Sequence, residues 1–214
     1  MKKTMLVSAA LLFAGFLMAA GPKYYQKMGQ TLPKFGECKS IDDYQNLANQ
    51  FSVIANVEIE EWLPVYYEAQ CYILMSFMEN ESSAKKDEYL DKAEIGINKL
   101  LTLAPNESEV YTLQAFYYTG RLVVNPQERG QKFGQLSGQA IGRALGIEPN
   151  NPRAQFIQLQ NEIGTARFFG NDIKPYLAKA QLLHDGWDNY KIKSRLHPRW
   201  GKNQVESLVK SLQG

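Results

Sequence analysis

The two histidines, His184 and His197, are the side chains of this sequence with the widest chemical range. His184 lies beside Asp185 and Asp188, and an imidazole next to carboxylates can transfer protons or bind a metal ion. The same residues suit the polar end of a helix, because a histidine there interacts favourably with the helix dipole. The sequence has no G-x-S-x-G, H-E-x-x-H, Walker A or G-x-G-x-x-G motif, so it predicts no catalytic residue, no cofactor and no metal site.

The three tryptophans, Trp62, Trp187 and Trp200, could line a carbohydrate or peptide site. Trp62 begins an apolar stretch with Leu63 and Val65, which favours a place in the core. Trp200, in the segment HPRWG, is predicted to pack under a C-terminal helix. We therefore interpret all three as packing residues.

Helical periodicity and capping residues predict an all-α chain, and no convincing alternating strand pattern appears. Ser40 can cap one helix, and Asn171 or Asp172 can cap another. Outside the repeated segment, the predicted helices cover residues 41–56, 62–78, 173–184 and 201–212.

A helix, a proline-containing turn and a second helix occur twice, 44 residues apart. The segment LLTLAPNE (100–107) matches ALGIEPNN (144–151), so that Pro105 and Pro149 occupy the same place. Three residues on one face of the preceding helix also match: Ala93, Ile97 and Leu100 with Ser137, Ile141 and Ala144. Because proline cannot continue a helix, each turn ends the helix before it.

This pattern resembles the tetratricopeptide repeat family, whose repeats end in a segment very like ALGIEPNN. The resemblance covers residues 59–190 and is clearest over 85–167. The usual repeat has about 34 residues, so about ten extra residues are predicted to lengthen the paired helices and their connection around GRLVVNPQERG. The resemblance implies a right-handed α-solenoid of about three helical hairpins. An N-terminal segment and helix (21–58) would precede it, and a C-terminal capping helix (191–214) would follow it.

The chain also resembles exported repeat proteins of Bacteroidetes. The segments that carry this resemblance are EEWLPVYYEAQ (60–70), YLDKAE (89–94), EPNNPRA (148–154) and HPRWG (197–201). Such proteins often have Gly-Gly-Asp before their last helical pair, whereas FFGND (168–172) has Asn171 there. The resemblance implies export and no known chemistry.

Residues 1–20 have the layout of a secretory signal peptide, because Lys2 and Lys3 precede an uncharged stretch shorter than the ~20 residues of a membrane span. We predict cleavage after Ala20; an uncleaved anchor is the alternative. Cleavage lowers the formal charge from +2 to 0, which leaves no electrostatic basis for binding nucleic acid or an anionic membrane. The mature chain is therefore predicted to be periplasmic or secreted, without membrane association.

Export also affects the interpretation of Cys38 and Cys71, the two cysteines of the sequence. A disulfide can persist outside the cytoplasm, so these residues can form one. Alternatively, Cys71 is a small buried hydrophobic residue within the apolar stretch AQCYILMSF.

The tetratricopeptide resemblance implies a concave surface formed by the first helix of each pair. The side chains that it places there are Tyr67, Glu109, Thr112, Phe116, Arg153, Phe156 and Gln160. Their mixture of aromatic rings, hydroxyls, an amide and both charges could hold an extended peptide, unless the terminal helices cover them. We therefore predict an exported, non-enzymatic module that binds a peptide or protein partner. A small-ligand or glycan-binding protein is the alternative, suggested by the 12% aromatic content and export, and an enzyme is less favoured.

Glycines recur at every fourth position from Gly130 to Gly146, in GQKFGQLSGQAIGRALG. Each glycine inside a helix costs roughly 0.5–1 kcal/mol relative to alanine, so this glycine stripe needs a reason. A membrane-type packing motif is excluded, because glutamine, lysine and arginine alternate with the glycines. We predict the close approach of a neighbouring helix of the same chain; self-association into a homo-oligomer is the alternative.

Overall fold

The computed structural model describes residues 21–78 and 81–213. Over these residues the chain is all-α, as predicted, with no strand. The helices are α1 (Pro22–Thr31), α2 (Ile41–Val57), α3 (Trp62–Ser76), α4 (Ser83–Leu103), α5 (Ser108–Val124), α6 (Pro126–Ile147), α7 (Pro152–Phe168), α8 (Tyr176–Gly186) and α9 (Lys202–Gln213), with short 3-10 helices η1 (Leu32–Gly36) and η2 (Trp187–Asn189). The predicted signal peptide lies outside the described residues.

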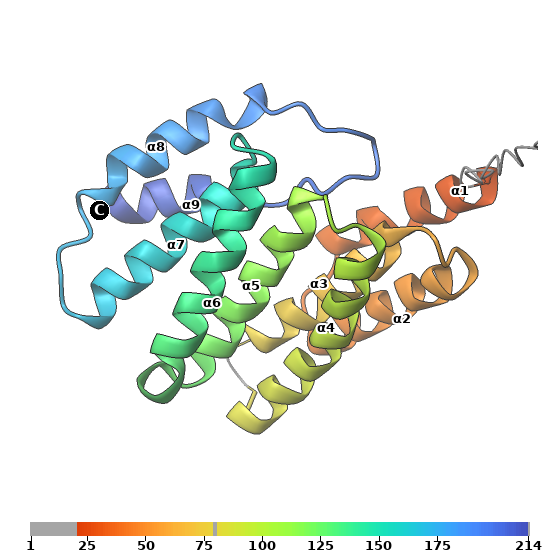
Figure 1. Ribbon diagram of the computed structural model, residues 1–214, viewed down its shortest axis with the longest axis horizontal. Coiled ribbons are helices and arrows are strands. Elements are labelled where there is room, and N and C mark those ends of the chain that lie inside the picture. Colours follow the sequence, from red (N-terminus) through yellow and green to blue (C-terminus); the bar gives the residue numbers. More distant parts are fainter. Residues whose placement is uncertain (1–20, 79–80, 214) are drawn as a thin grey trace, which may run out of the picture.

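The helices stack in sequence order as antiparallel pairs, from α1 and α2 at one end to α8 and α9 at the other (Figure 1). Helix α3 packs on α4, and α5 packs on α6. Helix α7 packs on α8, and α5 also contacts both α3 and α7, so the first helices of these three pairs, α3, α5 and α7, lie side by side as one layer. In the described part of the chain, no helix combines the length and the apolarity that a membrane span needs.

The 44-residue repeat is present in the structure as α4–turn–α5 and α6–turn–α7. In the first turn the amide of Ala104 donates to Leu100 O, and in the second the amide of Glu148 donates to Ala144 O. The matching face residues are all buried: Ala93, Ile97 and Leu100, and Ser137, Ile141 and Ala144. The extra residues lengthen α4 and α6, to 21 and 22 residues, whereas the predicted longer connection is wrong, because Asn125 alone separates α5 from α6.

The predicted cap of α2 is confirmed and that of α8 is wrong. Ser40 accepts a hydrogen bond from the amide of Asp43, whose carboxylate accepts one from the amide of Ser40. Helix α8 begins at Tyr176 instead of residue 173, and its N-cap, Pro175, makes no side-chain hydrogen bond. Asp172 instead accepts from the amide of Lys174, within the turn that precedes the helix.

Cys38 and Cys71 are both free thiols, so the disulfide considered from the sequence is not formed in this structure. Cys71 lies in the middle of α3 and is fully buried, which matches the alternative interpretation. Cys38 is half-buried, and its thiol donates to the carbonyl of Lys34, 3.3 Å away. Burial raises the pKa of both thiols, which keeps them protonated.

The glycine stripe lies on α6 and does not touch a neighbouring helix closely, so the predicted reason for it is wrong. Of its five members only Gly134 has a neighbour where a Cβ would be, Leu122 Cδ1 at 3.6 Å. Helices approach closely at Gly96 of α4, where a Cβ would lie 2.9 Å from the Cβ of Ala69 in α3, and at Gly120 of α5, where it would lie 2.9 Å from Leu90 Cδ2 in α4. A sequence spacing of four therefore did not identify the glycines that neighbouring helices require.

Gly138→Ala combined with Gly142→Ala is expected to raise the free energy of unfolding by about 1–2 kcal/mol, because alanine restricts the unfolded chain and nothing obstructs its methyl group. Gly96→Ala, also within a helix, is the matched control. It is expected to lower the free energy of unfolding, because its methyl group would meet Ala69. Urea unfolding measures both changes. A loss of stability in the double variant would mean that the stripe forms a contact that the single chain does not show.

Candidate functional site

A cavity of about 780 Å³ lies on the layer formed by α3, α5 and α7, and we call it the aromatic cavity. Seven segments supply its walls: η1, α2, α3, α5, α7, α9 and the connection Tyr190–Trp200, which we call the strap. Its aromatic lining consists of Phe35, Tyr44, Tyr67, Phe77, Phe116, Phe156 and Trp200. The cavity is within the range of about 300–1,000 Å³ that small-molecule sites occupy.

Three of these rings form a continuous stack along one wall. Phe77, at the end of α3, stacks on Phe116 of α5 with centroids 5.0 Å apart and an interplanar angle of 13°. Trp200 of the strap continues the stack at 5.6 Å and 25°. The indole N–H of Trp200 donates to the hydroxyl of Tyr66, 2.9 Å away, which fixes the ring. Together the three rings make this wall of the cavity apolar and aromatic.

Tyr67 links the aromatic cavity to the core and to the strap. Its ring stacks on Phe51 at 5.2 Å, and its hydroxyl donates to the carbonyl of Leu196 in the strap, 2.6 Å away. Burial raises the pKa of Tyr67, and also that of Tyr44, so both phenols remain neutral hydrogen-bond donors.

The polar lining of the aromatic cavity includes a buried amide in its wall and two arginines on the strap. Gln70 is 4% exposed, and its Oε1 has no hydrogen-bond partner among the described residues. A buried acceptor of this kind is costly unless a ligand or a water molecule donates to it. Arg195 and Arg199 line the cavity from the strap and are exposed. Apolar walls with cationic groups at their edge suit a ligand that carries carboxylates on a flat apolar body.

The structure divides the seven residues predicted for the concave surface into two groups. Four of them line the aromatic cavity together: Tyr67, Phe116, Phe156 and Gln160. The prediction is wrong for Glu109, Thr112 and Arg153, which are fully buried where the N-terminal ends of α5 and α7 meet. Arg153 donates to Glu109, and Asn151 donates to both Glu109 and Thr112, so these residues hold two repeats together and do not face a partner.

Arg153 and Glu109 form a buried ion pair at the centre of this polar group. The Nε and Nη2 atoms of Arg153 donate to the Glu109 carboxylate at 2.6–3.0 Å. The side chains are 2% and 0% exposed, so water screens the pair very little. The guanidinium also lies 5.1 Å from the ring centre of Tyr190, at the start of the strap.

The strap is not among the elements predicted from the sequence. Trp200 was predicted to pack under the C-terminal helix, whereas it stacks on Phe116 and lines the aromatic cavity. The residue packed at the start of α9 is Trp187, against Gly201, whose φ of +112° favours glycine. The strap could have been recognised from the run RLHPRWG (195–201). This run places arginines and aromatic rings together in a segment without helical periodicity.

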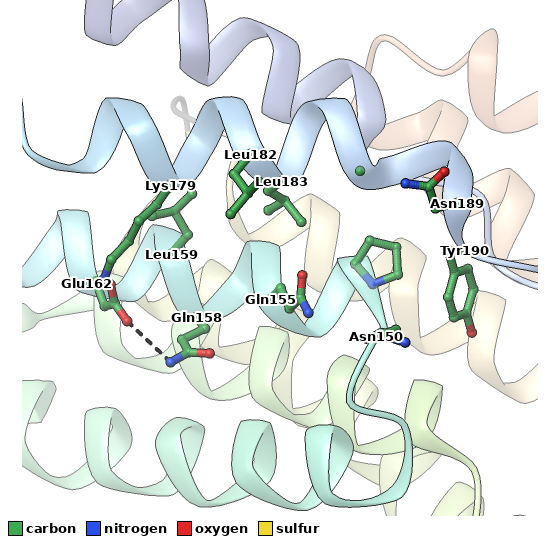
Figure 2. A pocket seen from close by; sticks show the side chains of 12 residues that line it. Asn150, Gln155, Gln158, Leu159, Glu162, Lys179, Leu182, Leu183, Asn189 and Tyr190 are labelled. Carbon is green, nitrogen blue, oxygen red and sulfur yellow. Dashed lines mark hydrogen bonds and ion pairs between the residues drawn. The ribbon is translucent and has the colours of Figure 1, made fainter.

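A second cavity, of about 490 Å³, lies between α7 and α8 and has a more polar lining (Figure 2). Side-chain amides line it from α7, from the turn before α7 and from η2: Asn150, Gln155, Gln158 and Asn189. Glu162 accepts hydrogen bonds from Gln158 and Lys179 at its far end. Tyr190 is the aromatic residue of its lining, so this cavity offers no stack of rings. In the described residues, His, Cys, Asp and Glu side chains do not gather in threes as a metal ion requires.

Comparisons with known proteins give one close structural likeness. No family model and no curated protein sequence matches the chain, so the tetratricopeptide assignment is not confirmed. Among solved structures, the HusA haemophore from Porphyromonas gingivalis superimposes with a TM-score of 0.77 and 30% sequence identity. The match covers 92% of this chain and 96% of that chain.

Proposed function

This chain belongs to the family of the HusA haemophore, and from that premise we propose that it is an exported, non-enzymatic protein that binds haem in the aromatic cavity. Haem is a flat apolar macrocycle with two carboxylates at one edge. The stack of Phe77, Phe116 and Trp200 offers an apolar, aromatic wall for the macrocycle, and the strap carries arginines for the carboxylates. This stack beside cationic side chains is the observation that carries the proposal.

The proposal corrects the function favoured from the sequence, a peptide or protein partner, in favour of its small-ligand alternative. An extended peptide remains the second candidate, because α3, α5 and α7 form the layer that tetratricopeptide-like repeats use for peptides. Three of the polar side chains expected to bind that peptide are buried in the Glu109–Arg153 group, which weakens this candidate. The signal-peptide layout of residues 1–20 supports export to the periplasm or beyond.

Titration of residues 21–214 with haemin tests the proposal. We expect saturable binding with one site per chain, seen in the absorbance of the haem and in quenching of tryptophan fluorescence, because Trp200 lines the aromatic cavity. Absence of saturable haemin binding would contradict the proposal. Binding of extended peptides that excludes haemin would favour the second candidate.

Arg195→Gln combined with Arg199→Gln is expected to weaken haemin binding about 3- to 10-fold, because each exposed charge pair contributes at most about 1 kcal/mol. Both arginines are exposed, so folding should be unaffected. Lys191→Gln removes an equally exposed charge of the strap that does not line the aromatic cavity, and it serves as the matched control. If the control weakens binding as much as the double variant, the arginines do not contact the ligand.

A further inference from the structure

The strap crosses from α8 back over the layer of first helices before α9 begins (Figure 1). It supplies four side chains to the aromatic cavity, namely Arg195, His197, Arg199 and Trp200. It also reaches α1, since the Arg195 guanidinium lies 5.4 Å from the ring centre of Tyr25. A ligand that enters between the strap and the helices must therefore displace it or pass beside it.

Building on the proposed function, we propose that the strap is the gate of the aromatic cavity and that Glu107 and Glu148 hold it closed through Lys193. The two glutamates belong to equivalent regions of the repeat: Glu107 lies in the turn between α4 and α5, and Glu148 in the turn between α6 and α7. Each repeat thus presents one carboxylate to the strap.

The strap is attached to the helices by side chains. The backbone hydrogen bonds of Tyr190–Trp200 that the described residues show are local, from Tyr190 to Trp187 and from His197 to Ser194. Backbone pairing that would resist displacement is therefore missing along this part of the chain. Residues 191–195, which form the N-terminal half of the strap, are all exposed.

Lys193 is the charged attachment of this exposed part. Its Nζ lies 2.6 Å from Glu107 Oε1 and 3.6 Å from Glu148 Oε2. The hydroxyl of Tyr190 donates to the same Glu148 oxygen at 2.9 Å, and His197 Nε2 lies 4.0 Å from Glu107 Oε2. Burial of Glu107 would by itself raise its pKa, but the hydrogen bond from Lys193 and the nearby His197 side chain lower it, so the carboxylate remains charged.

The remaining attachments lie at the cavity itself. Leu196 is buried, and its carbonyl accepts the hydrogen bond from Tyr67. Trp200 is held by its hydrogen bond to Tyr66. These contacts anchor the C-terminal part of the strap, so release of Lys193 should free the N-terminal part first and carry Arg195 away from the aromatic cavity.

Limited trypsin digestion of the full mature chain tests the gate, because Lys191, Lys193 and Arg195 are exposed on the strap and become substrates when it leaves the helices. Glu107→Gln combined with Glu148→Gln is expected to raise the cleavage rate within the strap about fivefold, since both partners of Lys193 lose their charge. Haemin association and dissociation rates, followed by stopped-flow absorbance, should rise together. Glu162→Gln, which removes the partner of Lys179 away from the strap, is the matched control.

Cleavage and haemin exchange together decide the question. Faster cleavage with faster haemin exchange in the double variant supports the gate. Cleavage equal to that of Glu162→Gln, or faster cleavage with unchanged haemin exchange, overturns it. If haemin binds to none of the proteins, the proposed function fails, and cleavage within the strap still shows whether Glu107 and Glu148 hold it.

Discussion

Replacement of Arg153 with methionine is expected to lower the free energy of unfolding by about 3–5 kcal/mol, the largest effect of any single change considered in this chain. The methionine leaves the Glu109 carboxylate buried without its opposite charge, and only the neutral amide of Asn151 continues to donate to it. The expected loss also includes the contact between the guanidinium and Tyr190. Urea unfolding followed by circular dichroism measures the change.

Two further variants separate the buried pair from ordinary ion pairs. Arg129→Met is the matched control: Arg129 pairs with Asp87, and both side chains are a quarter or more exposed. We expect this change to cost less than about 1 kcal/mol. Glu109→Leu added to Arg153→Met should restore much of the lost stability, because no unpaired charge then remains in the core. A loss from Arg153→Met no larger than that from Arg129→Met would show that the pair does not hold the repeats together.

The elements and the repeat could be predicted because their signals are local. Pro105 and Pro149 stop their helices for steric reasons, and Ser40 with Asp43 satisfies free amides at a helix start. These causes act within a few residues, so periodicity and spacing identify them. Helix α8 was placed three residues early, because a side chain that can cap a helix can equally form a turn, as Asp172 does.

The candidate site could be predicted only in part, because the direction of a side chain depends on contacts between repeats. Glu109 and Arg153 are 44 residues apart, so they occupy the same position in two consecutive repeats and carry opposite charges. Equivalent positions of stacked repeats can face each other, and this pairing was the signal available in the sequence. Tyr67 and Phe116, two of the rings predicted for the concave surface, line the aromatic cavity, Tyr67 buried and Phe116 half-buried.

The strap was beyond prediction for a different reason. Its residues follow no period, and their positions depend on long-range contacts, such as the bond between Tyr67 and Leu196 across 129 residues. For the glycine stripe, by contrast, the sequence predicted a contact that the structure lacks. Its regular spacing suggests a close helix contact, but Gly138 and Gly142 face open space. Regular spacing therefore located helices reliably and contacts poorly.

Phe116→Ala is expected to weaken haemin binding about 30-fold or more, because large aromatic anchors at a binding site commonly contribute 2 kcal/mol or more. Phe116 is the middle ring of the stack, so its removal leaves a gap between Phe77 and Trp200 in the wall of the aromatic cavity. The ring is half-buried, so we expect folding to survive the change. Haemin titration measures the affinity, and urea unfolding confirms the fold.

Phe169→Ala is the matched control, because Phe169 is a phenylalanine at the end of α7 that is 70% exposed and does not line the aromatic cavity. Haemin affinity should be unchanged in this variant. Wild-type affinity in Phe116→Ala would mean that haem does not lie on the stack, and the aromatic cavity would lose its main support as the haem site. An equal loss in both variants would indicate nonspecific adsorption of haemin to exposed rings. A loss confined to Phe116→Ala requires the ligand to contact the one wall on which α3, α5 and the strap meet.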